Sequence, residues 1–503
     1  MTTFAERCGV HDAPRTAACA RVLERLGDEG VERVRIGWCD LHGVLRGKTL
    51  LPRAVPRALA DGIGLVSTVL LKDTSDRTAW KVFEPGATAA LPGFGAANNL
   101  VLLPDPESFR LLPWSPGTAW LRAEAWFEDG TPVPFDTRRV LRRAVDALAG
   151  DGLALRAGLE LEFHVFRLAD GERDASLDPA NAAWPGEPPR LSLLHPGYNL
   201  LAEGWSDMAD EALRIVERTA AGLALPLTSL EIELGPSQVE AVFDVEDALD
   251  AADHAVLFRN GVRQALRRAG YHASFVCLPP FPNAMASGWH LHHSVVDRVS
   301  GDNAFVPAAE PGGPLSPAGA PTCEGDGPLS PLGRSWLAGL LAHGRAMQPF
   351  CAPTVNAYAR FRPNAMAPNA VVWGRDNRGA MLRVLGGAGQ PATRIENRSG
   401  EPTANPYLYL AAQIHAGRDG LARRLEPPPP TESPYASSPD DDARLPSSLG
   451  DALDALEADR ALVDAFGADV VDWLVHVKRF ELARLAQSPD PAAWQAREYF
   501  SRS

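Results

Sequence analysis

The sequence lacks the features that would place the protein in a membrane or outside the cell. Its 503 residues contain no run of about 18 apolar residues, so we expect no transmembrane helix. The N-terminal segment MTTFAERCGVHD is charged and has no apolar stretch typical of a secretion signal. The six cysteines form no CxxC pair and match no zinc-binding spacing. We therefore expect reduced thiols in a cytoplasmic protein.

Positive charge is also scarce. The chain has 49 Lys and Arg against 63 Asp and Glu, a formal net charge of −14, so neither nucleic acid nor a membrane surface is an expected partner. A Walker A loop is missing as well. The segment 43–49, GVLRGKT, has one residue too few between its glycines and lies in a predicted hairpin. A nucleotide would have to bind through other groups.

The rest of the chain has the composition of a globular protein and a visible organisation. Residues 31–51 alternate, turn at 40–43 and alternate again, which predicts a β-hairpin. Prolines at positions 104, 106, 113 and 116 predict a domain boundary near residue 115. The Pro- and Gly-rich segment 302–333 predicts a surface loop. We also expect helices over 16–26, 137–148, 336–347 and 449–486, a strand over 155–166, and a short polar tail at the C-terminus.

Carboxylates occur in pairs at strand spacing. Glu160 and Glu162 lie two apart in GLELEFHVF, and Glu231 and Glu233 lie two apart in SLEIELGPSQVE, with Glu240 after a Gly-Pro turn. Side chains two apart on a strand share one face, where two acids repel each other unless a cation lies between them. The alternative is a set of exposed acids on an amphipathic strand and hairpin.

Histidines and arginines show a similar spacing further along the chain. In SGWHLHHS, His290 and His292 share a face and His293 points the other way, which is typical either of ligands or of histidines in a core. In TRIENRSG, Glu396 lies between two arginines that share its face. Forked guanidinium donors suit phosphate and carboxylate groups, although surface ion pairs are the alternative. The arginines of this region are Arg360, Arg378, Arg383, Arg394 and Arg398.

Together these groups indicate a particular chemistry. Oxygen ligands with an occasional imidazole suit Mg²⁺ or Mn²⁺ rather than zinc. Arginines beside such ions favour phosphoryl transfer, because both offset the charge of the moving group.

In chain order, the motifs GLELEF, EIELGPSQVE, SGWHLHHS, NAYARFRP, RDNRGAMLR, RIENR and EPTANPYL resemble those of the glutamine synthetase superfamily, type I. The resemblance runs from about Val31 to the C-terminus. It implies an α+β fold with a small N-terminal β-grasp domain (1–115) and a large C-terminal catalytic α/β domain (116–503). It also implies a homo-oligomeric ring, commonly a dodecamer, with active sites between subunits.

The resemblance also implies roles for individual residues. ATP is expected as a substrate with two or more Mg²⁺ or Mn²⁺ ions. One ion would be held by Glu162, Glu233 and Glu240, and the other by Glu160, His290 and Glu396. Nucleotide would contact His292, Ser294, Arg383, Arg394 and, by a weaker match, Tyr198. Arg378, Arg383 and Arg394 would hold phosphate groups, Arg360 and Arg398 would bind glutamate, and Arg360, Arg378 and Arg383 would be catalytic.

The implied reaction has two steps: the acid takes the γ-phosphate of ATP as an acyl phosphate, and an amine then displaces phosphate. The glutamine-forming enzymes have a glutamate at the position of Met366 that binds ammonium, and a thioether cannot replace it. Glu231 and Ile232 replace two histidines, Met285-Ala286 replaces Asn-Gly, and Trp289 replaces a methionine. Met366 and Trp289 would give the site apolar character. The nearest match to the amine-side motif is KDTSD, with Asp73 and Ser75.

These departures favour a ligase that makes γ-glutamyl amides of organic amines, similar to the polyamine, ethanolamide and anilide synthetases of the superfamily. Two alternatives stay open. One is glutamine formation from ammonia with Asp73 or Glu231 as the replacement carboxylate, and the other is a non-catalytic structural or regulatory relative. Tyr435, near the region where some relatives are adenylylated, is interpreted as an ordinary loop tyrosine.

Overall fold

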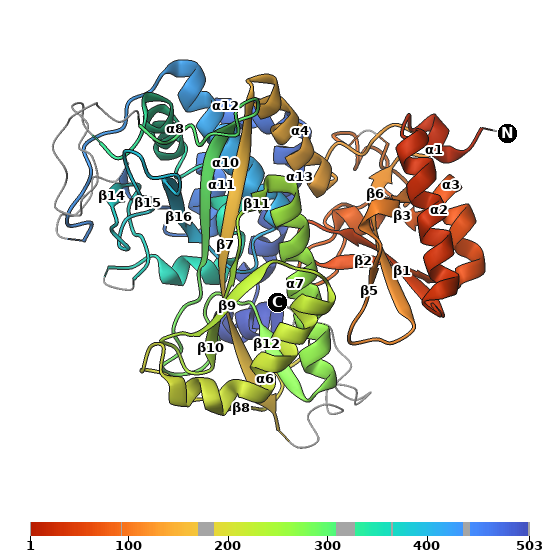
Figure 1. The fold of residues 1–503 in the computed structure, drawn as a ribbon, viewed down its shortest axis with the longest axis horizontal. Coiled ribbons are helices and arrows are strands. Elements are labelled where there is room, and N and C mark those ends of the chain that lie inside the picture. The colour runs from red at the N-terminus through yellow and green to blue at the C-terminus, as the bar shows by residue number, and fades with distance from the viewer. Residues whose placement is uncertain are drawn as a thin grey trace.

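The computed structural model describes residues 2–91, 93–169, 186–307, 327–363, 366–435 and 443–500. Within them the chain forms a small six-stranded sheet and a large ten-stranded sheet. Figure 1 shows the small sheet and the N-terminal helices on one side of the molecule and the large sheet on the other, with the C-terminal helices packed among the other helices of the large part. The predicted α+β fold is confirmed.

The small sheet is built around the predicted hairpin. β1 (Arg33–Cys39) and β2 (Leu45–Leu50) are antiparallel neighbours, and the strand order is β2-β1-β6-β4-β3 with β5 beside β6. Helices α1 (Phe4–Arg7), α2 (Ala13–Asp28) and α3 (Val55–Asp61) accompany it. The other strands are β3 (Ile63–Val66), β4 (Asn99–Pro104), β5 (Arg110–Leu111) and β6 (Thr118–Trp126).

The predicted domain boundary near residue 115 falls inside this small sheet. β6 pairs in parallel with β1 and antiparallel with β4, so the sheet is incomplete without residues 118–126. Pro113 and Pro116 belong to the turn that leads into β6, whereas Pro104 ends β4 and Pro106 begins a 3-10 turn. We therefore propose that the boundary lies between Trp126 and Thr137, where helix α4 (Thr137–Gly150) begins.

The large sheet runs β14-β15-β16-β13-β7-β10-β9, with β8, β11 and β12 also paired to β7. β7 (Leu153–Leu168) is sixteen residues long and contains the predicted strand. The other strands are β8 (Leu191–Leu193), β9 (Leu227–Ile232), β10 (Gln238–Phe243), β11 (Glu246–Asp247), β12 (Tyr271–Ser274), β13 (Trp289–Asp297), β14 (Trp373–Arg375), β15 (Leu382–Leu385) and β16 (Arg394–Gly400).

Helices cover this sheet. The expected helices near 16–26, 137–148 and 449–486 are confirmed by α2, by α4 and by α11 (Leu449–Ala458), α12 (Arg460–Phe466) and α13 (Ala468–Ala486). The helix expected over 336–347 is α8 (Pro331–Ala342), which begins earlier because Ser330 accepts a hydrogen bond from Gly333 and Pro331 suits the first turn. The others are α6 (Glu203–Gly222), α7 (Ala248–Arg268), α9 (Gln348–Cys351) and α10 (Pro406–Arg423). Residues 308–326 of the predicted Pro/Gly loop lie outside the described ranges.

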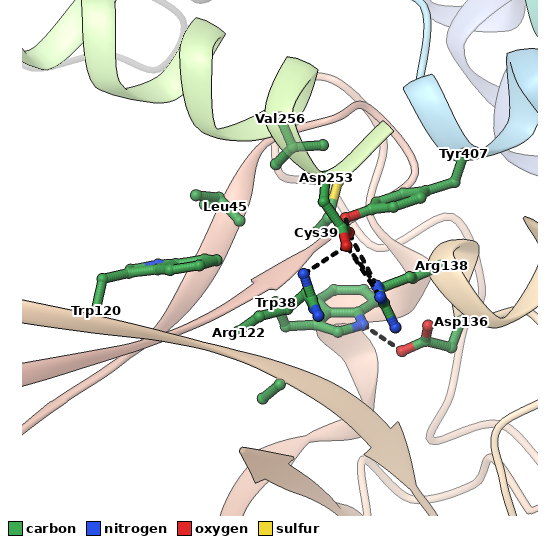
Figure 2. Close-up of a pocket in the computed structure, with 11 residues that line it drawn as sticks. Trp38, Cys39, Leu45, Trp120, Arg122, Asp136, Arg138, Asp253, Val256 and Tyr407 are labelled. Atoms are coloured by element: carbon green, nitrogen blue, oxygen red, sulfur yellow. Dashed lines mark hydrogen bonds and ion pairs between the residues drawn. The ribbon is translucent and has the colours of Figure 1, made fainter. Parts of the chain in front are cut away.

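A buried ion-pair network joins the small sheet to helices α4, α7 and α10 (Figure 2). Asp253 of α7 accepts hydrogen bonds from Arg122 at 2.5 Å, from Arg138 at 2.8 Å and from the hydroxyl of Tyr407 at 2.7 Å. Trp38 of β1 donates to Asp136, the cap of α4, at 2.7 Å. These contacts fix the small sheet against α7 and α10.

The C-terminal end is not the polar tail expected from the sequence. α14 (Pro491–Gln495) and a π-helical turn at Ala496–Phe500 end the described chain, and Trp494, Tyr499 and Phe500 are buried against Phe166 and Val276. Three aromatic residues in an otherwise polar segment anchor it to the core.

No helix within the described ranges is both long and apolar enough to span a membrane. The five cysteines that the structure describes are all free, as expected.

His343 links three helices and is expected to make stability depend on pH. Its Nδ1 lies 2.6 Å from Asp459 and its Nε2 lies 2.9 Å from Asp419. Burial alone would lower the pKa of His343, but the bonds to the two aspartates outweigh it and raise the pKa. Because the folded pKa is raised, the stabilisation is complete below the unfolded pKa of about 6.5 and is lost as pH rises through the folded pKa.

We expect His343→Gln to lower the free energy of unfolding by about 3 kcal/mol at pH 6 and by much less at pH 9. The check is the melting temperature of both proteins across this range. His476→Gln is the control, because the exposed ring of His476 bonds the carbonyl of Ala79 and stacks on Trp80, and neither contact is ionic. A His343→Gln deficit that is the same at both pH values would contradict the ionic role.

Candidate active site

Strand register brings the predicted acids and histidines to one face of the large sheet. On β7, Glu160 lies opposite His290 of β13, and Glu162 lies opposite Glu240 of β10. On β13, His292 lies opposite Glu396 of β16. Directly opposed residues share a face, and residues two apart on a strand do too. The predicted common face is confirmed, and His293 on the opposite face accepts a hydrogen bond from Trp336.

Three overlapping groups on this face could each hold a metal ion, with ligand atoms within 4.8 Å of one another. One is the predicted set Glu162, Glu233 and Glu240. The other predicted set, Glu160, His290 and Glu396, does not form one group. Glu160 forms one group with Glu240 and His290 and another with His292 and Glu396. His292, expected to contact nucleotide, thus has its Nε2 3.1 Å from Glu160 and is a further ligand candidate.

The carboxylates of this cluster repel one another electrostatically. Burial and the charge of Glu162 raise the pKa of Glu240 to about 10. Burial and the charge of Glu233 raise the pKa of Glu162 to about 7. A divalent cation among these oxygens would offset the repulsion that raises both values. The donor set therefore fits the Mg²⁺ or Mn²⁺ ions that the resemblance implies.

Glu160 has the opposite shift. Burial raises its pKa, but hydrogen bonds with His290 and His292 outweigh burial and leave the pKa well below its usual range. Burial and the nearby charge of Arg398 lower the pKa of His290 to about 4. A neutral imidazole is the form that binds a metal.

Glu162 is held by groups that the sequence did not single out. Its Oε2 accepts the backbone N–H of Gly288 at 2.8 Å and the side-chain amide of Gln238 at 3.0 Å. Gln238 lies in the GPSQVE motif, two residues before Glu240. Residues two apart on a strand share a face, so this spacing could have identified Gln238 as a residue of the site. The two bonds fix the orientation of one candidate ligand.

Arginines surround the buried carboxylate of Glu396. Arg383 donates to it at 3.0 Å and Arg398 donates to its other oxygen. Burial alone would raise its pKa, but the charge of Arg398 lowers it to about 2. Arg360, at the end of a 3-10 turn (Val355–Arg360), is 4% exposed and donates to the carbonyls of Arg398 and Gly400. The exposed Arg378 accepts from Arg398 through its carbonyl at 3.0 Å.

A cavity of about 570 Å³ lies beside the acids. His292, Ser294 and Arg394, all predicted to bind nucleotide, line it together with Glu160, and Leu159, Val242 and Phe243 supply apolar walls. Arg394 donates to Nδ1 of His292 at 3.0 Å. This volume and lining suit a nucleotide with its phosphates toward the acids.

Several predicted residues lie elsewhere. Tyr198 is 56% exposed, donates to the carbonyl of Asn283 at 2.7 Å and does not line the cavity. Trp289 is fully buried on the face opposite His290, in edge contact with Tyr409, so it gives the site no apolar wall. Tyr435 donates to the carbonyl of Ala367, as an ordinary loop tyrosine can.

Asp73 and Ser75 are not available as an amine-side pair within their own chain. Asp73 is fully buried and accepts a hydrogen bond from Arg484 at 2.5 Å. Ser75 bonds Arg484 and Glu498, so KDTSD anchors the C-terminal end. Asp73 and Arg484 are 411 residues apart in the sequence, which is why the sequence did not reveal this role.

The candidate ligand groups and the adjoining cavity, on one face of the large sheet, are those expected of a class of enzymes that use a nucleotide and divalent cations. Comparison with known proteins places the chain within this class. The model of the glutamine synthetase catalytic domain matches residues 134–499. The chain belongs to the glutamine synthetase family, whose members use ATP and divalent metal ions.

Among curated relatives, the chain is 36% identical to a γ-glutamylanilide synthase of Acinetobacter sp., covering 97% of each protein. It is 31% identical to the γ-glutamylethanolamide synthetase GlnA4 of Streptomyces coelicolor, covering 94% of this chain and 93% of that protein. Among solved structures, ligand-free GmaS superimposes with a TM-score of 0.73 at 28% identity, covering 94% of this chain and 98% of that chain.

Proposed function

We propose that this protein is an ATP-dependent ligase that joins the γ-carboxylate of glutamate to an organic amine through an acyl phosphate. The observation that carries the proposal is the cluster of Glu160, Glu162, Glu233 and Glu240 beside a nucleotide-sized cavity. The similarity to an anilide and an ethanolamide synthetase supports the amine side.

The residues of this chain have distinct tasks in that reaction. The cavity binds the nucleotide, with Arg394 and Ser294 at its lining. Arg360, held by two backbone carbonyls, presents a guanidinium to the α-carboxylate of glutamate, and Arg398 assists it. Arg383 and the exposed Arg378 offset charge on the transferring phosphoryl group. Bound at the acidic groups, Mg²⁺ or Mn²⁺ would polarise the phosphate oxygens.

The amine side is where the chain departs from glutamine formation. Met366 is 57% exposed in a left-handed backbone conformation, with φ of 53°, and offers no charge to an ammonium ion. Glu231 lies on β9 opposite Glu240 and is a second carboxylate at this end of the cluster. An organic amine can bury its carbon skeleton there at about 25 cal/mol per Å².

We further propose a homo-oligomeric ring in the cytoplasm, because the family resemblance implies rings with shared active sites. Light scattering and negative-stain images of the purified protein test the ring. A monomer that is fully active would overturn it.

Phosphate release from ATP tests the function. With Mg²⁺ and glutamate, we expect an aniline or another organic amine to drive release at least ten times faster than ammonium at equal concentration. The panel contains aniline, ethanolamine, putrescine, spermidine and a monoalkylamine. Equal or faster release with ammonium would support the alternative that the protein forms glutamine. No release with any amine would favour the alternative of a non-catalytic relative.

Met366→Glu is the matched probe of the amine side. We expect it to raise ammonium-dependent release by about tenfold or more and to slow release with the best organic amine, because it restores a carboxylate that attracts a cation. Met208→Glu, which is equally exposed on α6 at 53%, should change neither rate. If both variants behave alike, the identity of residue 366 does not set the amine.

A further inference from the structure

A second cavity, of about 180 Å³, lies between the small sheet and helix α7, away from the acidic cluster. β1, β2 and β6 form one wall, the turn before β6 forms the floor, and α7 forms the other wall. The register pairs Arg35 with Thr49 and with Trp120, so these side chains share the face toward α7. Nothing in the proposed reaction uses this cavity.

Small residues keep the cavity open by letting two indole rings line it. A Cβ at Gly37 would come 2.4 Å from Nε1 of Trp120, and a Cβ at Gly261 would come 3.0 Å from the ring of Trp114. Each indole therefore packs closely against a backbone without a side chain. The result is a slot with aromatic walls.

The cavity has an excess of hydrogen-bond donors. Arg35 donates to the amide oxygen of Gln264 at 2.8 Å, and Trp114 donates to the same oxygen at 3.3 Å. The indole N–H of Trp120 has no acceptor among the residues that the structure describes, and Figure 2 draws it without a contact. Arg35 has no carboxylate partner in the same ranges.

The neighbouring arginines are paired, which sets Arg35 apart. Arg46 bonds Asp40 and Asp76, and Arg122 bonds Asp105 and Asp253. Burial, with the charges of Arg268 and Arg33, lowers the pKa of Arg35. A half-buried guanidinium without a counter-ion is costly unless an anion joins it.

We propose that this slot binds a small organic anion with a flat apolar body, such as an aromatic monocarboxylate. The carboxylate pairs with Arg35 and accepts from Trp120, and the ring lies between the indoles. The volume is adequate, because a cavity of about 150 Å³ accommodates benzene. The ligand bridges the small sheet and α7, next to the ion-pair network of Figure 2, and so stabilises the junction between the two parts.

Calorimetric titration of the full-length protein with benzoate tests the proposal, in the absence of ATP and amine. We expect saturable binding of one benzoate per chain, at least tenfold weaker binding of benzamide, which lacks the charge, and at least tenfold weaker binding of acetate, which lacks the ring. Arg35→Gln should weaken benzoate binding at least tenfold. Arg33→Gln, which changes an exposed arginine two residues away, should leave it unchanged.

Three results would overturn the proposal: equal affinity of wild type and Arg35→Gln, acetate binding as tightly as benzoate, or displacement of benzoate by saturating ADP and glutamate. The last result would place benzoate in the catalytic site instead. Phosphate release measured on the same preparations keeps this test separate from the proposed ligase activity. A ligase that fails there can still bind benzoate, and the reverse also holds.

Discussion

Glu240→Gln is expected to abolish amide formation and the stabilisation of the protein by divalent cations. Glu240 belongs to two of the three groups that could hold a metal ion, so its loss weakens both. Substitution of a residue that only hydrogen-bonds a metal ligand lowers metal affinity or activity about 10- to 100-fold. Removal of a ligand itself should therefore lower activity at least about 100-fold. The metal-free protein should be no less stable than wild type, because burial and the charge of Glu162 already favour the neutral form of Glu240, and glutamine is a neutral side chain of the same shape.

Activity and melting temperature, each measured against Mg²⁺ and Mn²⁺ concentration, check this expectation. Glu231→Gln is the matched control. Glu231 lies opposite Glu240 on the same face and bonds Ser229, but it belongs to none of the three groups. It should keep the shift of melting temperature with metal. If Glu231→Gln loses the shift and Glu240→Gln keeps it, the candidate ligand set is wrong.

What could be predicted from the sequence depended on local geometry. The two-residue period of a strand placed Glu160 with Glu162 and His290 with His292, and the register of the sheet then brought these pairs together. The same period predicts that Trp289 points to the face opposite its neighbour His290. Side-chain alternation therefore already argues against Trp289 as a residue that lines the site.

Contacts between distant segments could not be predicted in this way. The pairing of β6 with β1 is the reason that we propose a domain boundary beyond residue 115, and the bond of Asp73 to Arg484 lies within a motif expected at the amine side. Neither partner can be identified from one sequence, because pairing of distant segments depends on the whole topology. The grouping of Glu160 with His292 and Glu396 likewise depends on distances between side-chain atoms, which spacing in the sequence does not give.

The second large effect is expected from a single methyl group at Gly288. An added Cβ would lie 2.4 Å from Nη2 of Arg360 and 3.0 Å from Nε2 of His290. Arg360 cannot retreat easily, because it is 4% exposed and bonds two backbone carbonyls. We expect Gly288→Ala to lower kcat/KM for glutamate about 100-fold, since a displacement of about 1 Å in a catalytic site has an effect of this size.

The KM values for the two substrates separate displacement from unfolding. Arg360 is proposed to bind glutamate and does not line the cavity proposed for the nucleotide, so the KM for glutamate should rise much more than the KM for ATP. Gly204→Ala is the control, because Gly204 lies in α6 with nothing within 4 Å of the added Cβ, and it should be neutral or slightly stabilising. Equal changes in both KM values, together with a lowered melting temperature, would mean that Gly288 supports the fold rather than the position of Arg360.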